Sequence, residues 1–230
     1  MAVVLLSGGL DSALNLALAA KAGRASLALT MRYGQRAEPA EVRAAHALAR
    51  HYGVRWESVD LGWLGDVNPT RLTRPDTELP QPTTADLDSK EKSTASMQAV
   101  WVANRNGLFL NVAAAYAEAL KENEILVGFN AEEAVTFPDN SPAFISAIDK
   151  AFTFSTLNKV TVHSYTLDWE KPRIMREALE TQLPLDLVWS CYEAGPGRCW
   201  KCESCKRSER ALLSAGNAGK SWLEKLGWKA

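Results

Sequence analysis

Residues 2–12 read Ala-Val-Val-Leu-Leu-Ser-Gly-Gly-Leu-Asp-Ser, and this stretch decides the fold. Its apolar first half predicts a buried strand, and the apolar run Ala13–Ala20 that follows predicts a helix. A glycine-rich turn between a strand and a helix N-terminus presents backbone N–H groups to an anion, and the helix dipole favours the negative charge. The two glycines let the backbone approach a ligand without a Cβ in the way. We therefore predict a phosphate site at Ser7–Ser12.

The turn differs from two common phosphate-binding patterns, because no lysine follows it as in the Walker sequence and its spacing is not Gly-x-Gly-x-x-Gly. It resembles the PP-loop of the ATP pyrophosphatase superfamily, Ser-Gly-Gly-x-Asp-Ser. The resemblance implies that the loop binds the pyrophosphate part of ATP and that the enzyme activates a carbonyl or carboxylate by adenylation. Asp11 is then a candidate Mg²⁺ ligand and, with Ser12, a catalytic residue. The predicted ATP contacts in this region are Leu6, Ser7, Gly8, Gly9, Leu10, Asp11, Ser12 and Ala13.

The composition bounds the class of protein. The chain has 230 residues, of which 47% are hydrophobic and 23% charged, and this suffices for one α/β domain with a sizeable core. A net charge of −1 argues against non-specific binding of nucleic acid. No apolar stretch is long enough to span a bilayer and no signal segment is recognisable, so we expect a cytoplasmic protein.

Short apolar segments alternate with amphipathic ones along most of the chain. This alternation predicts a doubly wound parallel sheet with helices on both faces, and the loop resemblance makes it adenine nucleotide alpha hydrolase-like, of PP-loop type. In such sheets the ligand binds beyond the carboxyl ends of the strands. Strands are expected at Val3–Leu6, Ala25–Met31, Arg55–Asp60, Glu124–Gly128 and Val160–Ser164. Helices are expected at Asp11–Lys21, Ala37–Tyr52, Asn106–Lys121, Pro142–Thr153, Pro172–Glu180 and Lys206–Ala215.

Two segments stand apart from this alternation. Residues 68–92 contain prolines among threonines and aspartates without periodicity, so we expect a long surface loop that acts as a lid over the substrate. Residues 1–185, this loop included, are expected to form the nucleotide-binding domain. Residues 186–230 are expected to form a four-cysteine metal-binding and helical subregion.

The four cysteines of the chain, Cys191, Cys199, Cys202 and Cys205, all lie in that subregion. In a cytosolic chain the spacing Cys-x7-Cys-x2-Cys-x2-Cys favours metal binding over disulfides. Four thiolates satisfy tetrahedral Zn²⁺ with no open position, so the predicted zinc site is structural. Consecutive Cys-x2-Cys-x2-Cys also occurs in iron–sulfur ligation, and the spacing leaves both metals open.

Three further segments narrow the superfamily. They are Tyr33-Gly34-Gln35-Arg36, then Gly128–Glu133 with Phe137–Asn140, and Cys202-Glu203-Ser204-Cys205. Together with Ser7–Ser12 they resemble the QueC family of queuosine biosynthesis, the 7-cyano-7-deazaguanine synthases, over nearly the whole chain. The resemblance implies a homodimeric ligase that takes 7-carboxy-7-deazaguanine, ammonia and Mg·ATP, forms an amide, and dehydrates the amide to the nitrile.

The resemblance also implies roles for particular residues. Tyr33 and Gln35 would lie near the nucleotide. Arg105 and Lys171 are candidate catalytic residues, and Arg105 would contact a phosphate or the substrate carboxylate. Phe137 would stack on the deazapurine, and Asp139 would accept hydrogen bonds from its guanine-like edge. The predicted substrate contacts are Asn106, Asn130, Phe137 and Asp139.

The chain departs from the family pattern at four positions. Arg32 stands where an acidic residue is common, Ala37 where a histidine is usual, and Ala103 where a proline is usual. Trp200 stands where a glycine commonly follows a cysteine of the knuckle. The loop and the cysteines are intact, so these departures bear on the identity of the acyl acceptor rather than on ATP or metal binding.

Two other functions compete with the nitrile-forming ligase. A divergent QueC-like ligase would couple the activated acid to another amine, for example on a protein in a defence system. A tRNA-thiolating PP-loop enzyme would carry an iron–sulfur cluster, but this chain has no basic excess and no fifth cysteine to carry sulfur. We therefore expect small-molecule substrates and no direct contact with nucleic acid or membrane.

Overall fold

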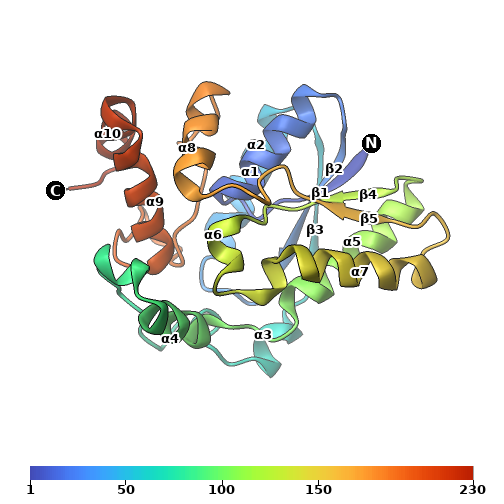
Figure 1. The fold of residues 1–230 in the computed structure, drawn as a ribbon, viewed down its shortest axis with the longest axis horizontal. Coiled ribbons are helices and arrows are strands. Elements are labelled where there is room, and N and C mark those ends of the chain that lie inside the picture. Colours follow the sequence, from blue (N-terminus) through green and yellow to red (C-terminus); the bar gives the residue numbers. More distant parts are fainter. Residues whose placement is uncertain (230) are drawn as a thin grey trace.

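The centre of the molecule is a five-stranded parallel sheet, in a computed structural model that describes residues 1–229 (Figure 1). The strand order is β3-β2-β1-β4-β5. The strands β2 and β3 therefore lie on one side of β1, and the chain then crosses to place β4 and β5 on the other side of β1. Such a reversal opens a crevice between neighbouring loops at the carboxyl ends of the strands. The strands are β1 (Ala2–Leu5), β2 (Ala25–Arg32), β3 (Arg55–Asp60), β4 (Glu124–Leu126) and β5 (Thr161–His163).

Helices cover both faces of the sheet, as the alternating sequence pattern predicts (Figure 1). Side chains alternate along a strand, so neighbouring residues enter different cores. Val3 of β1 joins the core beneath α5 (Arg105–Ala119) and α7 (Pro142–Ser155). Val4 joins the core on the other face, beneath α1, α2 and α8. The remaining helices are α1 (Leu10–Lys21), α2 (Glu38–His51), α3 (Trp63–Val67), α4 (Lys90–Val100), α6 (Ala131–Ala134), α8 (Lys171–Glu180), α9 (Glu203–Ser214) and α10 (Gly216–Lys225).

The C-terminal helices extend the layer of α8 (Figure 1). Leu212 of α9 and Leu223 of α10 are buried in the same core as α1 and α8. The four-cysteine segment runs into the first turn of α9 and contributes Cys191, Cys202 and Cys205 to the core on the other face. Residues 186–229 therefore pack on the sheet domain through both of its cores.

The expected strands and helices are present, with ends that differ from the observed ones by a few residues. The segment 68–92 departs from expectation, because a 3₁₀ turn occupies Ala85–Asp88 and α4 begins at Lys90. Ser89 caps α4 by accepting a hydrogen bond from the backbone of Lys92 at 3.4 Å. The sequence of α4 is polar and carries little apolar periodicity, which is why the helix was not expected. None of the described helices is long and apolar enough to cross a membrane.

Candidate active site

A cavity of about 260 Å³ opens where β1, β2 and β4 end. The PP-loop forms its floor, and residues from the starts of α5, α8 and α9 form its walls. The predicted site residues that line it are Leu6, Ser7, Gly9, Leu10, Asp11, Ser12, Tyr33, Gln35, Arg105, Asn106, Phe137 and Lys171. Four other predicted residues, Gly8, Ala13, Asn130 and Asp139, do not line it. The crevice that the sheet topology predicts is therefore a real cavity with the PP-loop in it.

Gly8 shapes the PP-loop. Its φ of +83° lies in the left-handed region, and a Cβ at this position would lie 2.8 Å from the carbonyl oxygen of Glu41. A side chain at Gly8 is therefore excluded both by backbone conformation and by the close approach of α2. The hydroxyls of Ser7 and Ser12 lie 3.0 Å apart and tie the two ends of the loop together.

The first turn of α1 faces the cavity with donors available. Gly9 is the N-cap and supplies no side-chain acceptor to the helix. The first N–H groups of a helix have no intrahelical partner, so they can donate to an anion. Residues that precede the cysteines support this turn: Trp189 donates its N–H to the Gly8 carbonyl at 2.8 Å. The Leu10 N–H donates to Ser190 Oγ at 3.4 Å.

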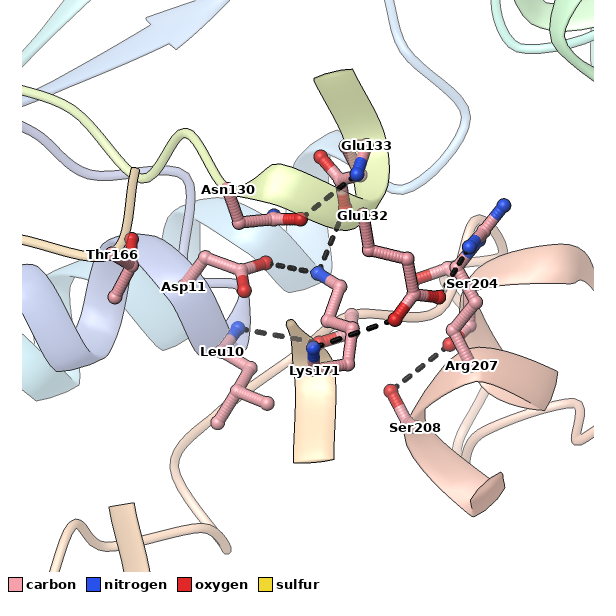
Figure 2. Close-up of polar contacts among 12 residues, drawn as sticks. Leu10, Asp11, Asn130, Glu132, Glu133, Thr166, Lys171, Ser204, Arg207 and Ser208 are labelled. Atoms are coloured by element: carbon pink, nitrogen blue, oxygen red, sulfur yellow. Dashed lines mark hydrogen bonds and ion pairs between the residues drawn. The ribbon is translucent and has the colours of Figure 1, made fainter. Parts of the chain in front are cut away.

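Lys171 lies between two carboxylates beside the PP-loop (Figure 2). Its Nζ bonds Asp11 Oδ2 and lies 2.8 Å from Glu133 Oε1. Burial lowers the pKa of this ammonium, but the two carboxylates outweigh burial and raise it above the ordinary value. Burial raises the pKa of Asp11, and the Lys171 charge opposes that shift. The ion cluster thus brings together α1, α6 and α8, which are distant in sequence.

One oxygen of Asp11 is unpaired. In the described part of the chain, Asp11 Oδ1 is buried and has no hydrogen-bond partner. A buried carboxylate oxygen without a partner is costly unless a ligand satisfies it. Its position beside the anion-binding turn fits a divalent cation that bridges to phosphate oxygens, since Mg²⁺ prefers carboxylate ligands.

The α9 wall carries a second ion cluster, whose residues were not among the predicted site residues (Figure 2). Arg207 bonds Glu132 of α6 and lies 2.8 Å from Glu203 Oε1. Arg210 also reaches Glu132, at 2.8 Å. Ser96 of α4 donates to the other oxygen of Glu203. These contacts join α4, α6 and α9 around the cavity mouth.

The β2 side of the cavity has a different polar chain. Gln35 Oε1 accepts from the Tyr33 N–H at 2.9 Å, and Gln35 Nε2 donates to Glu41 Oε2 at 2.8 Å. Arg105 donates to the Tyr33 hydroxyl at 3.3 Å. Burial raises the pKa of Tyr33 to about 12, so its hydroxyl stays protonated near neutral pH. Tyr33 and Gln35 therefore stand at the cavity, and Glu41 joins them without having been predicted.

The predicted substrate residues divide into two groups. Phe137 and Asn106 line the cavity, and Phe137 stacks on Trp101 with ring centroids 6.2 Å apart. Asn130 instead caps α6, where its Oδ1 accepts from the Glu133 N–H at 2.9 Å. Asp139 accepts from the Asn140 side chain at 3.4 Å and from Asn106 through its carbonyl at 3.3 Å. Asn130 and Asp139 thus support residues that line the cavity.

None of the four departures from the family pattern lines this cavity. Arg32 pairs with Glu38 at 2.9 Å on the surface, and Ala37 is buried at the start of α2. Trp200 adopts a φ of +57°, which explains why glycine is common at that position. The cavity lining is therefore independent of these substitutions.

The four cysteine sulfurs gather in one place, as the spacing predicts. Their Sγ atoms all lie within 4.8 Å of one another, and three of the four residues are buried. Backbone N–H groups point at the sulfurs: Cys199 donates to Cys191 Sγ at 3.3 Å, and Cys202 to Cys199 Sγ at 3.3 Å. Such N–H···S bonds stabilise thiolate, the form that binds metal. The cluster therefore has the ligand number and the close sulfur spacing of a four-cysteine metal site.

The sheet topology and the glycine-rich loop at its switch point define an α/β protein of PP-loop type. A solved structure of the U34-tRNA thiolase NcsA from Methanococcus maripaludis with its [4Fe-4S] cluster is similar to this chain, with a TM-score of 0.52 and 12% sequence identity. The likeness covers 98% of this chain and 70% of that one. At this identity it shows the shared fold alone, and it confirms the predicted fold class.

Sequence comparison is more specific. Residues 1–216 match the family described as Queuosine biosynthesis protein QueC. The chain is 48% identical over 214 residues to a 7-cyano-7-deazaguanine synthase from Desulforamulus reducens, covering 93% of this chain and 94% of the relative. It is 46% identical to the 7-cyano-7-deazaguanine synthase from Pelotomaculum thermopropionicum, and the match covers 93% of this chain and 97% of that relative. The chain belongs to the QueC family, which confirms the resemblance drawn from its motifs.

Proposed function

We propose that this chain is an ATP-dependent ligase that converts 7-carboxy-7-deazaguanine and ammonia to 7-cyano-7-deazaguanine. Its membership of the QueC family and its 48% identity to a named synthase support the proposal. The observation that carries it is the PP-loop at the cavity floor, beside a buried Asp11 with an unpaired oxygen. This arrangement suits phosphate groups together with a cation.

The chemistry explains why such a site is needed. A carboxylate is a poor electrophile, so ATP first converts it to an activated ester. Ammonia then displaces the phosphate-bearing group and gives the amide. A second activation, on the amide oxygen, followed by loss of two N–H protons, gives the nitrile. The protein contributes mainly by positioning the reactants and stabilising charge.

The residues present can fill the required roles. The Ser7 and Ser12 hydroxyls and the first N–H groups of α1 would hold the phosphates. Asp11 would hold Mg²⁺, which when bound neutralises negative charge on the phosphate groups. Lys171 fixes the Asp11 carboxylate, and Arg105 stands where it can bind the substrate carboxylate. Phe137 would stack on the deazapurine, and Asp139 remains a predicted ligand of its N–H edge.

We propose Zn²⁺ as the metal of the cysteine cluster. Zn–S bonds of about 2.3 Å in a tetrahedron place the sulfurs about 3.8 Å apart. The Sγ atoms of Cys199 and Cys205 are 3.9 Å apart. A [4Fe–4S] cluster needs wider spacing, because each of its four thiolates binds a different iron. Metal analysis of the purified protein distinguishes the two, and a visible absorption band would overturn the zinc proposal.

Three further features belong to the proposal. Phe154 and Leu157 at the end of α7 are 82% and 93% exposed, and they offer an apolar surface for a homodimer. Light scattering at several concentrations tests this.

The segment before α4 would act as a lid over the cavity, because Leu72 of this segment lines the cavity. Arg36 holds the segment in place: it donates hydrogen bonds to the carbonyl oxygens of residues 71, 74 and 77 and to the carboxylate of Glu193. The enzyme would act in the cytoplasm. Its chain would form a nucleotide-binding part up to about residue 185 and a metal-binding part after that residue.

Mass spectrometry of products tests the function. The purified protein is incubated with 7-carboxy-7-deazaguanine, ¹⁵N-ammonium and Mg·ATP. We expect one ¹⁵N atom in a product with the mass of the nitrile. An Asp11→Asn variant serves as the control for ATP activation and should yield no product. Accumulation of amide or activated acid without nitrile would overturn the proposal and point to another acceptor.

A further inference from the structure

Four carboxylate side chains line the cavity, and three of them form an ion pair with a lysine or arginine. Asp11 and Glu133 share Lys171, and Glu203 pairs with Arg207. The fourth, Glu41, has no Lys, Arg or His nitrogen within 4.0 Å of its carboxylate among the residues that the structure describes. Glu41 is thus the one carboxylate of the described cavity lining whose basicity is not already reduced by an ion pair.

Glu41 also stands close to the PP-loop. The carbonyl oxygen of Glu41 approaches the PP-loop so closely that it would lie 2.8 Å from a Cβ on Gly8. Its carboxylate accepts one hydrogen bond, from Gln35 Nε2 at 2.8 Å, through Oε2. Oε1 forms no hydrogen bond within the described part of the chain, and Glu41 lines the same cavity as Arg105 and Asp11. The second oxygen is free to accept a proton from a bound substrate.

We propose that Glu41 is the general base that removes protons from the attacking nitrogen of ammonia. The inference rests on the proposed function, because it concerns the amine half of that reaction. Glu41 is not among the site residues that the sequence analysis selected.

The protons balance as follows. The nitrogen lone pair of ammonia forms the N–C bond to the activated carboxyl carbon, and the adduct nitrogen becomes positively charged. Glu41 takes one N–H proton as the C–O bond to the leaving group breaks, and the bonding pair departs with the phosphate oxygen. In the dehydration step the activated amide loses its remaining two N–H protons, and the C–O bond again breaks towards phosphate. Glu41 is the acceptor within the cavity, and solvent receives each proton between steps.

The surroundings suit this role. Burial raises the pKa of Glu41 to about 7, against opposing effects of the Gln35 hydrogen bond and the Arg105 charge. Glu38 on the same helix raises it further. Tyr33 also belongs to this wall, and it stays neutral. A general base is most efficient when its pKa lies near the working pH.

The test separates activation of the acid from reaction with the amine. Glu41→Gln keeps an acceptor for Gln35 but removes the base. In single-turnover ATP cleavage with 7-carboxy-7-deazaguanine and no ammonia, we expect the variant to match the wild type within about threefold. With ammonium added, amide formation should fall about 10²–10⁴-fold. With hydroxylamine, which is unprotonated at neutral pH and gives a more acidic adduct, most of the rate should return.

The pH profile provides a second readout. Normalised to free ammonia, the wild-type rate should rise with pH and level off above about 7, because only ionised Glu41 accepts a proton. Glu41→Gln should lose this dependence. Glu38→Gln is the matched control: Glu38 lies on the same helix outside the cavity lining and raises the pKa of Glu41, so this variant should keep the pH dependence with its midpoint moved to lower pH.

The outcomes are distinguishable. If wild-type protein cleaves no ATP in the presence of the acid, the proposed function itself fails. If activation is intact and Glu41→Gln reacts with ammonia at the wild-type rate, the assignment of Glu41 is wrong. Equal losses with ammonia and hydroxylamine would show that Glu41 only supports the structure, which also overturns the assignment.

Discussion

The PP-loop and the four-cysteine segment lie at opposite ends of the chain and are built by different means. Ser7–Ser12 is contiguous, and its shape comes from one left-handed glycine and hydrogen bonds between serines. The cysteine segment spans residues 191–205, and its four sulfurs converge on one point as metal ligands do. A loop of the first kind depends on packing around it, whereas the second depends on metal ligation.

The two regions meet at residues 189 and 190. Trp189 donates its N–H to the Gly8 carbonyl at 2.8 Å, and Ser190 Oγ accepts from the Leu10 N–H at 3.4 Å. Cys191 follows immediately. The residues just before the first cysteine thus support the PP-loop, although the four cysteines have no predicted role in the reaction. The following variants test how far that support extends, from the largest expected effect to the smallest.

Removal of one sulfur ligand should have the largest effect. Metal binding contributes on the order of 10 kcal/mol to folding in small zinc sites, so Cys202→Ser should lose the metal and loosen residues 186–214. Because this segment holds Gly8 and Leu10, ATP binding should weaken at least about tenfold. Metal analysis and calorimetric titration with ATP measure both losses. Lys201→Ala, an exposed side chain in the same knuckle, is the control. Full ATP affinity in metal-free Cys202→Ser would break the link between the two regions.

Loss of the central cation should come second. Lys171→Met leaves Asp11 and Glu133 buried without their counter-charge, which costs about 3–5 kcal/mol. Urea unfolding measures the change. The double variant with Asp11→Asn should recover part of the stability and none of the activity. A Lys171→Met protein as stable as wild type would show that solvent reaches the pair.

Gly8→Ala tests the loop's dependence on packing. A left-handed backbone and a Cβ 2.8 Å from the Glu41 carbonyl oxygen should together cost roughly 2–4 kcal/mol. Gly23→Ala is the matched control, because Gly23 has a φ of +66° but nothing within 4 Å of its Cβ position. It should cost only about 1 kcal/mol. If thermal unfolding shows that Gly8→Ala and Gly23→Ala lose the same stability, then the backbone conformation alone, and not the approach of α2, excludes a side chain at Gly8.

Glu41, which lies beside the PP-loop, should make the stability of the folded protein depend on pH. Its folded-state pKa of about 7 exceeds the usual 4.5, so the folded state holds this proton at pH values where the unfolded state has lost it. Stability therefore falls as pH rises from about 4.5 to 7. Glu41→Gln should consequently be more stable than wild type at pH 8, by about 1–3 kcal/mol, and should show no gain at pH 4. Chemical denaturation at both pH values measures this, and a gain that persists at pH 4 contradicts it.

Ser190→Ala should have the smallest effect. It removes one hydrogen bond to the Leu10 N–H, and such bonds contribute about 0.5–1.5 kcal/mol. We expect the KM for ATP to rise a few-fold with kcat nearly unchanged, since the loop keeps the Trp189 bond. Steady-state kinetics measures the two constants. A large fall in kcat would mean that Ser190 acts on the substrate directly.

Sequence patterns alone predicted the fold class, the PP-loop and the gathering of the four cysteines. Each is encoded by residues close together in the chain: an apolar strand before a glycine turn, alternating helices and strands, and four cysteines within residues 191–205. Local backbone conformation and side-chain spacing are enough to specify such features. The motif resemblance to the QueC family was confirmed for the same reason.

Only the tertiary structure decided which distant side chains meet. Lys171 bonds Asp11 across 160 positions, Arg207 bonds Glu132 across 75, and Glu41 stands unpaired beside the PP-loop. Asp139, close in sequence to the cavity-lining Phe137, does not line the cavity. Helix α4 was not predicted, because its polar sequence shows little apolar periodicity. Its one local signal is Ser89, which caps its N-terminus. Charge pairing depends on packing of whole elements, and no local pattern in the chain records that packing.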